Sequence, residues 1–230
     1  MLDDGAGVAR RGASLLAAAA RAATSERGRF LVALSGGSTP WQMLRALADE
    51  DVPWQAVHVF QVDERVAPEG DPLRNLTGLR ECLLGRVPLP EAQLHAMPVE
   101  AADLESAARD YAAALARAAG APPVLDLVHL GLGSDGHTAS LVPDDAALEV
   151  RDADVFVTAP YAGHRRMTLT YPALDRARRV LWLVTGEAKA AMLARLRAGD
   201  RTIPAGRVRR DRAVVLADRA AAADAAGTRK

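Results

Sequence analysis

The sequence predicts an α/β fold: a single domain over residues 1–230, built on a mostly parallel, twisted, Rossmann-like sheet with helices on both faces. Two observations predict it. Short apolar runs alternate with amphipathic helical patterns along most of the chain, the order in which crossover helices join parallel strands. In addition, no linker, internal repeat or low-complexity tract divides the chain into parts.

Strands are predicted where short apolar runs lie between turn residues. The strongest is 124–130, which only Asp126 and His129 interrupt. The other predicted strands are 30–34, 57–62, 155–158, 167–170, 180–185 and 213–216. Because ligands of open parallel sheets bind at the carboxyl ends of the strands, the loops after these strands are where chemistry is expected.

Helices are predicted from the spacing of apolar residues at 40–48, 71–84, 101–119, 172–178, 187–197 and 218–226. The alanine-rich segment that follows Arg10 and Arg11 superficially resembles a twin-arginine export signal. However, the residues before it are acidic, and Arg21 interrupts the apolar run early. We therefore expect an amphipathic first helix there.

Composition excludes several classes of protein. Lys and Arg total 29 and Asp and Glu also total 29, so no overall field attracts nucleic acid or an anionic membrane surface. No apolar stretch reaches the length of a membrane span. Cys82 is the single cysteine, so it forms no internal disulfide, and we expect a cytoplasmic protein. One cysteine and no His-Glu-x-x-His pattern predict no metal site.

The first unusual loop lies between the strand 30–34 and the helix 40–48. Glycines allow the backbone to approach a ligand closely, hydroxyls supply donors, and the helix N-terminus favours an anion. A plain turn with a capping hydroxyl is the alternative interpretation. The loop thus predicts a phosphate site made of Ser35, Gly36, Gly37, Ser38 and Thr39.

The second unusual segment is Asp63-Glu64-Arg65, three charges directly after the strand 57–62, with Asn75 in the next loop. Its position fits the crevice of a parallel sheet. The alternative is a solvated turn with a weak local ion pair.

The third loop, 131–143, contains Gly131, Gly133 and Gly136 in the spacing of a dinucleotide-binding fingerprint. That interpretation needs a long apolar helix after the third glycine, whereas this chain has polar residues and then Pro143. The loop also holds an aspartate two residues before a histidine. We expect Asp135 to orient His137 as a general base, with a histidine bonded only to the backbone as the alternative.

Two basic residues complete the predicted site. Arg166 precedes the run 167–170, and Lys189 is placed in the first turn of the helix 187–197. A cation opposes the helix dipole at that position, so an anionic ligand would explain it. Lysine is also rare here, because only Lys189 and Lys230 occur among 29 basic residues.

Together these segments resemble the 6-phosphogluconolactonases, in that family's order and over most of the chain. The matching segments are Leu34 to Pro40, Asp63-Glu64-Arg65, Gly131 to Leu141, Arg166-Met167-Thr168-Leu169-Thr170 and Gly186-Glu187-Ala188-Lys189-Ala190. Two positions depart from the family pattern: Val142, where phenylalanine is common, and Arg74, where serine often precedes the asparagine. We interpret both as changes around the site.

The resemblance implies the hydrolysis of 6-phosphogluconolactone, a phosphorylated sugar lactone, without a cofactor. His137 would accept a proton from water, Asp135 would fix the imidazole, and Arg65 would face the oxyanion. The loop 35–39, Arg166 and Lys189 would hold the phosphate. Asp63 is a rival base, because the matching aspartate has that role in the related glucosamine-6-phosphate deaminases, whose fold this chain is expected to share.

Three alternatives remain. A deaminase-like isomerase is disfavoured because the glutamate that follows the histidine loop in deaminases is absent, and because arginine replaces their tyrosine at position 65. A non-catalytic sugar-phosphate-binding regulator would need a DNA-binding module, for which residues 1–29 are too few. The dinucleotide-binding oxidoreductase is the weakest.

Overall fold

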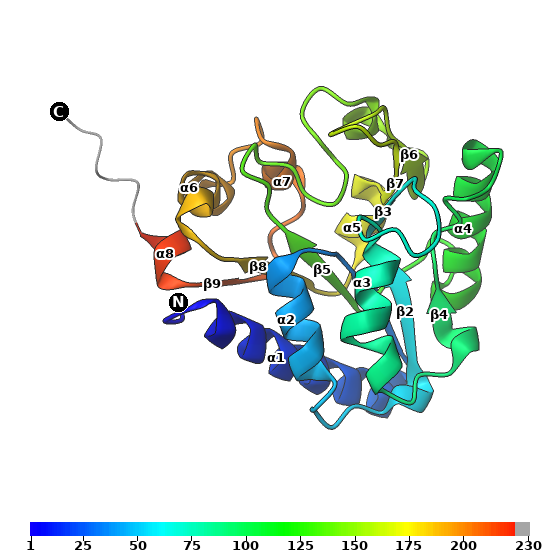
Figure 1. Cartoon of the computed structure of the whole chain (residues 1–230), viewed down its shortest axis with the longest axis horizontal. Helices are drawn as coiled ribbons and strands as arrows, with labels where there is room; N and C mark the ends of the chain where they lie inside the picture. Colours follow the sequence, from blue (N-terminus) through cyan, green and yellow to red (C-terminus); the bar gives the residue numbers. More distant parts are fainter. Residues whose placement is uncertain (224–230) are drawn as a thin grey trace.

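The main sheet in the computed structural model, which describes residues 1–223, contains six parallel strands. Their order is β4-β2-β1-β5-β8-β9 (Figure 1). The strands are β1 (Phe30–Leu34), β2 (Val57–Gln61), β4 (Leu94–His95), β5 (Leu127–Gly131), β8 (Val180–Val184) and β9 (Ala213–Ala217). A mostly parallel sheet was predicted, and the prediction is confirmed.

The helices surround this sheet. They are α1 (Gly5–Arg27), α2 (Ser38–Leu47), α3 (Asn75–Cys82), α4 (Leu104–Ala119), α5 (Tyr171–Arg176), α6 (Ala190–Ala198), α7 (Pro204–Arg207) and α8 (Arg219–Ala222). Short 3-10 turns lie at η1 (Trp54–Ala56), η2 (Leu84–Arg86), η3 (Glu91–Gln93), η4 (Ala146–Glu149) and η5 (Glu187–Lys189). The predicted helix 218–226 corresponds to α8, and its residues 224–226 lie outside the described part of the chain.

Alternation along the strands gives the sheet two cores, one on each face. In β1, Val32 packs with α1, α2 and α3, whereas Ala33 packs with α4 and α5. In β8, Leu183 joins the first core and Trp182 the second. Successive side chains of a strand point to opposite faces, so a fully apolar strand is buried on both sides. Helices on both faces are therefore confirmed.

The first helix is the alanine-rich segment that was expected to be amphipathic. α1 begins at Gly5, where Asp4 caps its N-terminus by accepting a hydrogen bond from Gly7 N, and ends at Arg27, after which Gly28 forms the C-cap with a φ of 74°. Its small buried side chains, such as Ala13 and Ala17, allow close packing on α2 (Figure 1). Among the described residues, no helix has the length and apolar character needed to span a bilayer.

Three strands form a second, antiparallel sheet in the order β3-β7-β6. They are β3 (Asp63–Arg65), β6 (Val155–Val157) and β7 (Arg166–Leu169). One expectation and one alternative interpretation need correction here. The runs 155–158 and 167–170 do not extend the parallel sheet, and Asp63-Glu64-Arg65 is a strand, not the solvated turn that was its alternative interpretation. Pairing with β7 supplies hydrogen-bond partners for these three residues, which local sequence does not encode.

The strand order reverses between β1 and β5. From β1 the chain first adds β2 and β4 on one side, and it later adds β8 and β9 beyond β5 on the other. In sheets of this type the loops after the two central strands diverge and leave a crevice. The loop that begins at Ser35 and the loop that begins at Leu132 lie on either side of this crevice.

Candidate active site

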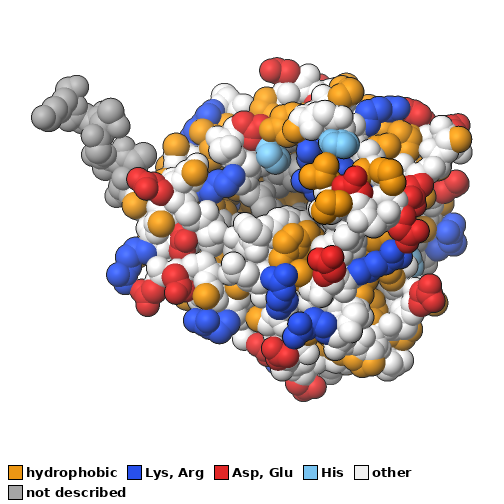
Figure 2. All heavy atoms as spheres, viewed as in Figure 1, with side chains coloured by type: hydrophobic (Ala, Val, Ile, Leu, Met, Phe, Trp, Pro, Cys, Tyr) orange, Lys and Arg blue, Asp and Glu red, His pale blue; other side chains and the backbone are white. Residues whose placement is uncertain are grey.

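A cavity of about 270 Å³ opens at the carboxyl ends of β1 and β5. Figure 2 shows a hollow on this face, bordered by histidine and by Lys or Arg side chains. Nearly all of the predicted site residues line the cavity: Ser35, Gly36, Gly37, Ser38, Thr39, Asp63, Arg65, His137, Arg166 and Lys189. Asp135 is the exception, because it contacts His137 without lining the cavity. Five separated segments of sequence thus meet at one place.

The predicted histidine–aspartate pair is formed. His137 Nδ1 lies 2.6 Å from Asp135 Oδ1, and the backbone N–H of His137 donates to the same oxygen. Burial acts to raise the pKa of Asp135, but the hydrogen bonds from His137 N and Tyr161 and the nearby imidazole outweigh it and lower that pKa. Since Nδ1 is engaged by Asp135, Nε2 is the ring nitrogen left for a ligand in the cavity.

Glycine is required at two positions of the loop that holds this pair. A Cβ atom at Gly133 would lie 2.2 Å from His137 Nδ1, so any side chain there would displace the imidazole. Gly136 has a φ of 86° and packs against Ile203 of the segment before α7. The spacing that imitates a dinucleotide fingerprint therefore has another cause, namely close approach to His137 and a left-handed turn.

The loop after β1 presents backbone donors to the cavity. Gly37, with a φ of 126°, precedes α2, and no side chain caps that helix. Its first-turn N–H groups and its dipole thus face the cavity. Thr39 Oγ1 lies 2.6 Å from Thr185 Oγ1 at the end of β8. Ser35 differs from the expectation, because its hydroxyl donates to the carbonyl of His129 and fixes the loop to β5.

Three cations surround the cavity. Arg65 and Arg166 are cross-strand neighbours in the antiparallel sheet, and Lys189 ends the turn η5 before α6. None of the three takes part in an ion pair within residues 1–223. Burial, followed by the charge of Arg65, lowers the pKa of Arg166. Placing like charges side by side is unfavourable, so an anionic ligand would stabilise this arrangement.

Asp63 lies at the cavity wall with both carboxylate oxygens engaged. Ser140 Oγ donates to Oδ2 over 2.6 Å, and Asn75 Nδ2 donates to Oδ1 over 3.2 Å. The residue as a whole is 5% exposed. These two buried donors fix the carboxylate in place, so the contacts of Asp63 fit a structural part in the site.

Asn75 and Glu64 belong to the site although their sequence signals were weak. Asn75 was noted only for its position, and Glu64 only as part of the charged segment. Asn75 Oδ1 accepts a hydrogen bond from Arg65 Nη1 over 2.5 Å and fixes that guanidinium at the cavity. It also explains Gly36, because a Cβ atom there would lie 2.0 Å from Asn75 Oδ1.

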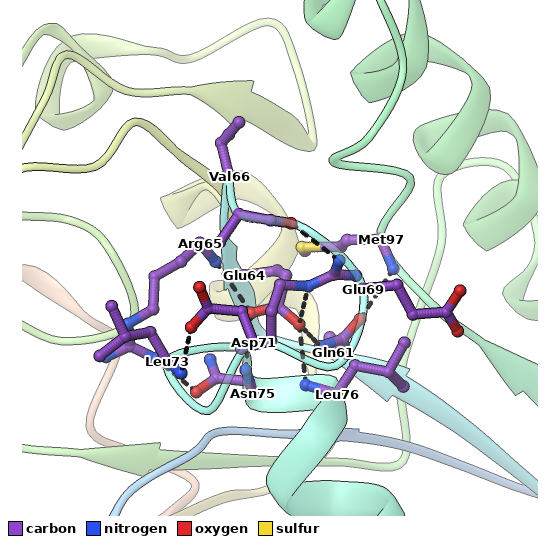
Figure 3. Close-up of polar contacts among 12 residues, drawn as sticks. Gln61, Glu64, Arg65, Val66, Glu69, Asp71, Leu73, Asn75, Leu76 and Met97 are labelled. Atoms are coloured by element: carbon purple, nitrogen blue, oxygen red, sulfur yellow. Dashed lines mark hydrogen bonds and ion pairs between the residues drawn. The ribbon is translucent and has the colours of Figure 1, made fainter.

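Glu64 is fully buried and joins β3 to the start of α3 (Figure 3). Its carboxylate accepts hydrogen bonds from the backbone N–H groups of Arg65, Asn75 and Leu76 and from Gln61 Nε2. Arg74 Nε lies 3.3 Å from the same carboxylate, so the residue that departs from the family pattern balances a buried charge. This network sets the position of Asn75 and, through it, of Arg65.

Comparison with known proteins identifies the family. The model of the family "Glucosamine-6-phosphate isomerases/6-phosphogluconolactonase" matches residues 3–216. The chain is 43% identical over 178 residues to a 6-phosphogluconolactonase of Synechocystis, covering 76% of this chain and 74% of that protein. It superposes on a 6-phosphogluconolactonase of Thermotoga maritima with a TM-score of 0.85 and 29% identity, over 94% of this chain and 96% of the other.

A likeness in fold extends further. A monomeric glucosamine-6-phosphate deaminase superposes with a TM-score of 0.83 at 19% identity, over 96% of each chain, so the fold expected for this chain is confirmed. Sequence identity to the lactonases is much higher than to that structure. By the extent of the family match and by these relatives, the chain belongs to the family of glucosamine-6-phosphate isomerases and 6-phosphogluconolactonases.

Proposed function

We propose that His137 activates the water with which this enzyme hydrolyses 6-phosphogluconolactone to 6-phosphogluconate, the lactonase step of the pentose phosphate pathway. One observation carries the proposal. The Asp135–His137 pair lies at the carboxyl end of β5, beside a cavity whose other wall holds cations that have no ion-pair partner among residues 1–223. A base and a site for anions are the two parts that hydrolysis of a phosphorylated lactone requires.

The chemistry follows from ester hydrolysis. Nε2 of His137 takes a proton from water as the water oxygen bonds to the lactone carbonyl carbon, and the carbonyl oxygen becomes an oxyanion. Asp135 stabilises the imidazolium that forms, because its carboxylate lies 2.6 Å from Nδ1. When the oxyanion collapses, the bond from the carbonyl carbon to the ring oxygen breaks. The imidazolium then returns its proton to the ring oxygen, which becomes a hydroxyl.

Arg65 is proposed to face the oxyanion. Its guanidinium is held by Asn75, so it requires little reorganisation as charge develops on the carbonyl oxygen. Fixed donors directed at developing charge supply one of the largest contributions to catalysis. A free arginine at the surface would have to be ordered during the reaction, at a cost in side-chain entropy.

The phosphate is proposed to bind between α2 and the two remaining cations. Backbone N–H groups from Gly36 to Thr39 and the helix dipole would contact its oxygens, and Arg166 and Lys189 would supply charge. This end of the substrate does not react. Binding of the phosphate orients the lactone, and sugars that lack a phosphate bind less well.

Hydrolysis of the lactone, followed by proton release in weak buffer with the spontaneous rate subtracted, tests the proposal. We expect rapid turnover of 6-phosphogluconolactone and a much higher KM for the lactone without phosphate. Glucosamine 6-phosphate should be neither deaminated nor bound well, since its ammonium group would meet the Arg65 guanidinium. Ammonia release from glucosamine 6-phosphate would contradict the assignment to the lactonase branch.

A further inference from the structure

Tyr161 contacts both members of the proposed catalytic pair but does not line the cavity. It lies on the hairpin between β6 and β7, and its hydroxyl donates to Asp135 Oδ2 over 2.9 Å. The other oxygen of the same carboxylate, Oδ1, is the one that lies 2.6 Å from His137 Nδ1. Asp135 is therefore fixed on both oxygens, and its orientation toward the imidazole depends on a residue 26 positions later in the chain.

The ring of Tyr161 reaches a second part of the site. The centre of the Arg166 guanidinium lies 5.1 Å from the centre of the tyrosine ring, within the range of a cation–π contact. The His137 ring meets the same ring edge-to-face at 5.6 Å. Arg166 Nε is buried without a hydrogen-bond partner within the described residues. One side chain thus contacts both the proposed base and a proposed phosphate ligand.

The hairpin holds Tyr161 firmly. The backbone of Tyr161 pairs with that of His164, and Ala162 and Gly163 form a tight turn with φ values of 50° and 85°. Thr158 N donates to the carbonyl of Arg166, so the pairing of β6 with β7 continues into the start of the loop that joins them. Tyr161 is half-buried and does not line the cavity. Its influence on the substrate is therefore exerted through its neighbours.

We propose that Tyr161 is a positioning residue, which orients Asp135 through its hydroxyl and Arg166 through its ring and so aligns the base with the bound phosphate. The proposal rests on the function proposed above. It adds a residue that no sequence pattern indicated, because Tyr161 acquires its contacts only when the β6–β7 hairpin packs against the loop after β5.

The contact also affects how charge is distributed around His137. The charged or titratable groups around this part of the site are Asp135 after β5, Tyr161 in the hairpin, Arg166 in β7, Asp63 and Arg65 in β3, and Lys189 in η5. The hydrogen bond to Asp135 raises the pKa of Tyr161, so the hydroxyl remains the donor. Without that donor, Asp135 would present more negative charge to the imidazole and favour its protonated form.

Two variants separate the hydroxyl from the ring. Tyr161→Phe should lower kcat about tenfold, the equivalent of one hydrogen bond to a charged group, and leave KM unchanged. The acid limb of its kcat/KM profile should move to higher pH by a few tenths of a unit. Tyr161→Leu should in addition raise KM about threefold, because Arg166 loses its cation–π partner.

Two controls distinguish positioning from general damage. Tyr171→Phe also removes one hydrogen-bonded tyrosine hydroxyl, which donates to the carbonyl of Pro204 away from the cavity, and it should leave kcat, KM and the pH profile unchanged. In an Asp135→Asn background, Tyr161→Phe should have little further effect, since both changes act through the same carboxylate.

The role of the hydroxyl, the role of the ring and the proposed function can each be refuted separately. Wild-type kinetics and pH profile in Tyr161→Phe would overturn the role of the hydroxyl, as would losses that add fully to those of Asp135→Asn. An unchanged KM in Tyr161→Leu would overturn the role of the ring. Absence of lactonase activity in the unmodified protein would instead refute the proposed function, which is measured first.

Discussion

At the scale of single residues, the contacts of His137 and Asp63 distinguish two candidates for the base. His137 has one ring nitrogen bound to Asp135 and the other free to meet a ligand. Asp63 has both oxygens occupied, by Ser140 and by Asn75. Protonation of a carboxylate that two buried donors already contact would weaken those two hydrogen bonds.

Substitution of each residue tests that distinction. His137→Ala should fold normally and lose about 10²- to 10⁴-fold in kcat, the usual range for a removed general base. Asp63→Asn should lose less activity and more thermal stability. The new amide would point its N–H₂ group at Ser140 Oγ or Asn75 Nδ2, each of which donates a hydrogen bond to Asp63 in the unmodified protein. Rates are measured with the spontaneous hydrolysis subtracted, and melting by circular dichroism. Near-normal turnover by His137→Ala would transfer the role to Asp63.

At the scale of elements, the loop after β5 depends on where its glycines lie. A Cβ atom at Gly133 would lie 2.2 Å from His137 Nδ1, whereas one at Gly131 would meet nothing within 4 Å. Gly133→Ala should therefore lower kcat by at least tenfold as the imidazole moves out of line, an effect typical of a misplaced catalytic group. Gly131→Ala, two residues away, is the matched control. Equal kinetics of the two variants would refute this explanation of the glycine.

The elements that supply cations should control binding more than turnover. Arg166→Ala in β7 and Lys189→Ala at the end of η5 should raise KM more than they lower kcat, because a remote phosphate is held similarly in the ground and transition states. Arg165→Ala is the control: it is adjacent to Arg166, but it pairs with Glu105 at the surface and should change neither constant. If kcat and kcat/KM fall equally in Arg166→Ala or Lys189→Ala, that residue contacts the reacting carbonyl instead.

At the scale of the whole molecule, His129 contacts the loop after β1 and makes the folding stability of the protein depend on pH. It lies fully buried in β5, where its Nδ1 accepts a hydrogen bond from Ser35 N, and burial lowers its pKa from 6.5 to about 3. The unfolded chain binds this proton more readily than the folded one. This contribution is therefore fully present above about pH 6.5 and is lost as the pH falls from there toward 3.

Urea unfolding at pH 7, 6 and 5 measures this effect. Near pH 5 the free energy of unfolding should fall by about 1.4 kcal/mol per pH unit on account of His129 alone. His129→Asn keeps an acceptor for Ser35 but does not titrate, so it should be less stable at pH 7 and show a shallower dependence on pH. Other histidines are common to both proteins and cancel in the comparison. If the free energy of unfolding changed with pH equally in the unmodified protein and in His129→Asn, His129 would not be the group responsible.

The sequence by itself determined the alternation of strands and helices and the loops in which function resides. Apolar runs such as 124–130 can be buried only between two layers of helices, and glycines and charges directly after such runs have few structural reasons to be there. The predicted phosphate loop and the Asp135–His137 pair were found in this way, whereas Arg166 was predicted from its place before the run 167–170 and Lys189 from its place in the first turn of a predicted helix. All but Asp135 line one cavity, and Asp135 contacts His137 without lining it.

Only the tertiary structure decided how those segments meet. Pairing of β3 with β7, whose residues lie about one hundred positions apart, made Asp63-Glu64-Arg65 a strand and brought Arg65 beside Arg166. The contacts of Asn75, Glu64 and Tyr161 also join distant segments. Local patterns report periodicity and turns, whereas partners across a sheet or between loops depend on the whole packing of the chain. The partners of a buried carboxylate such as Asp63 follow from that packing alone.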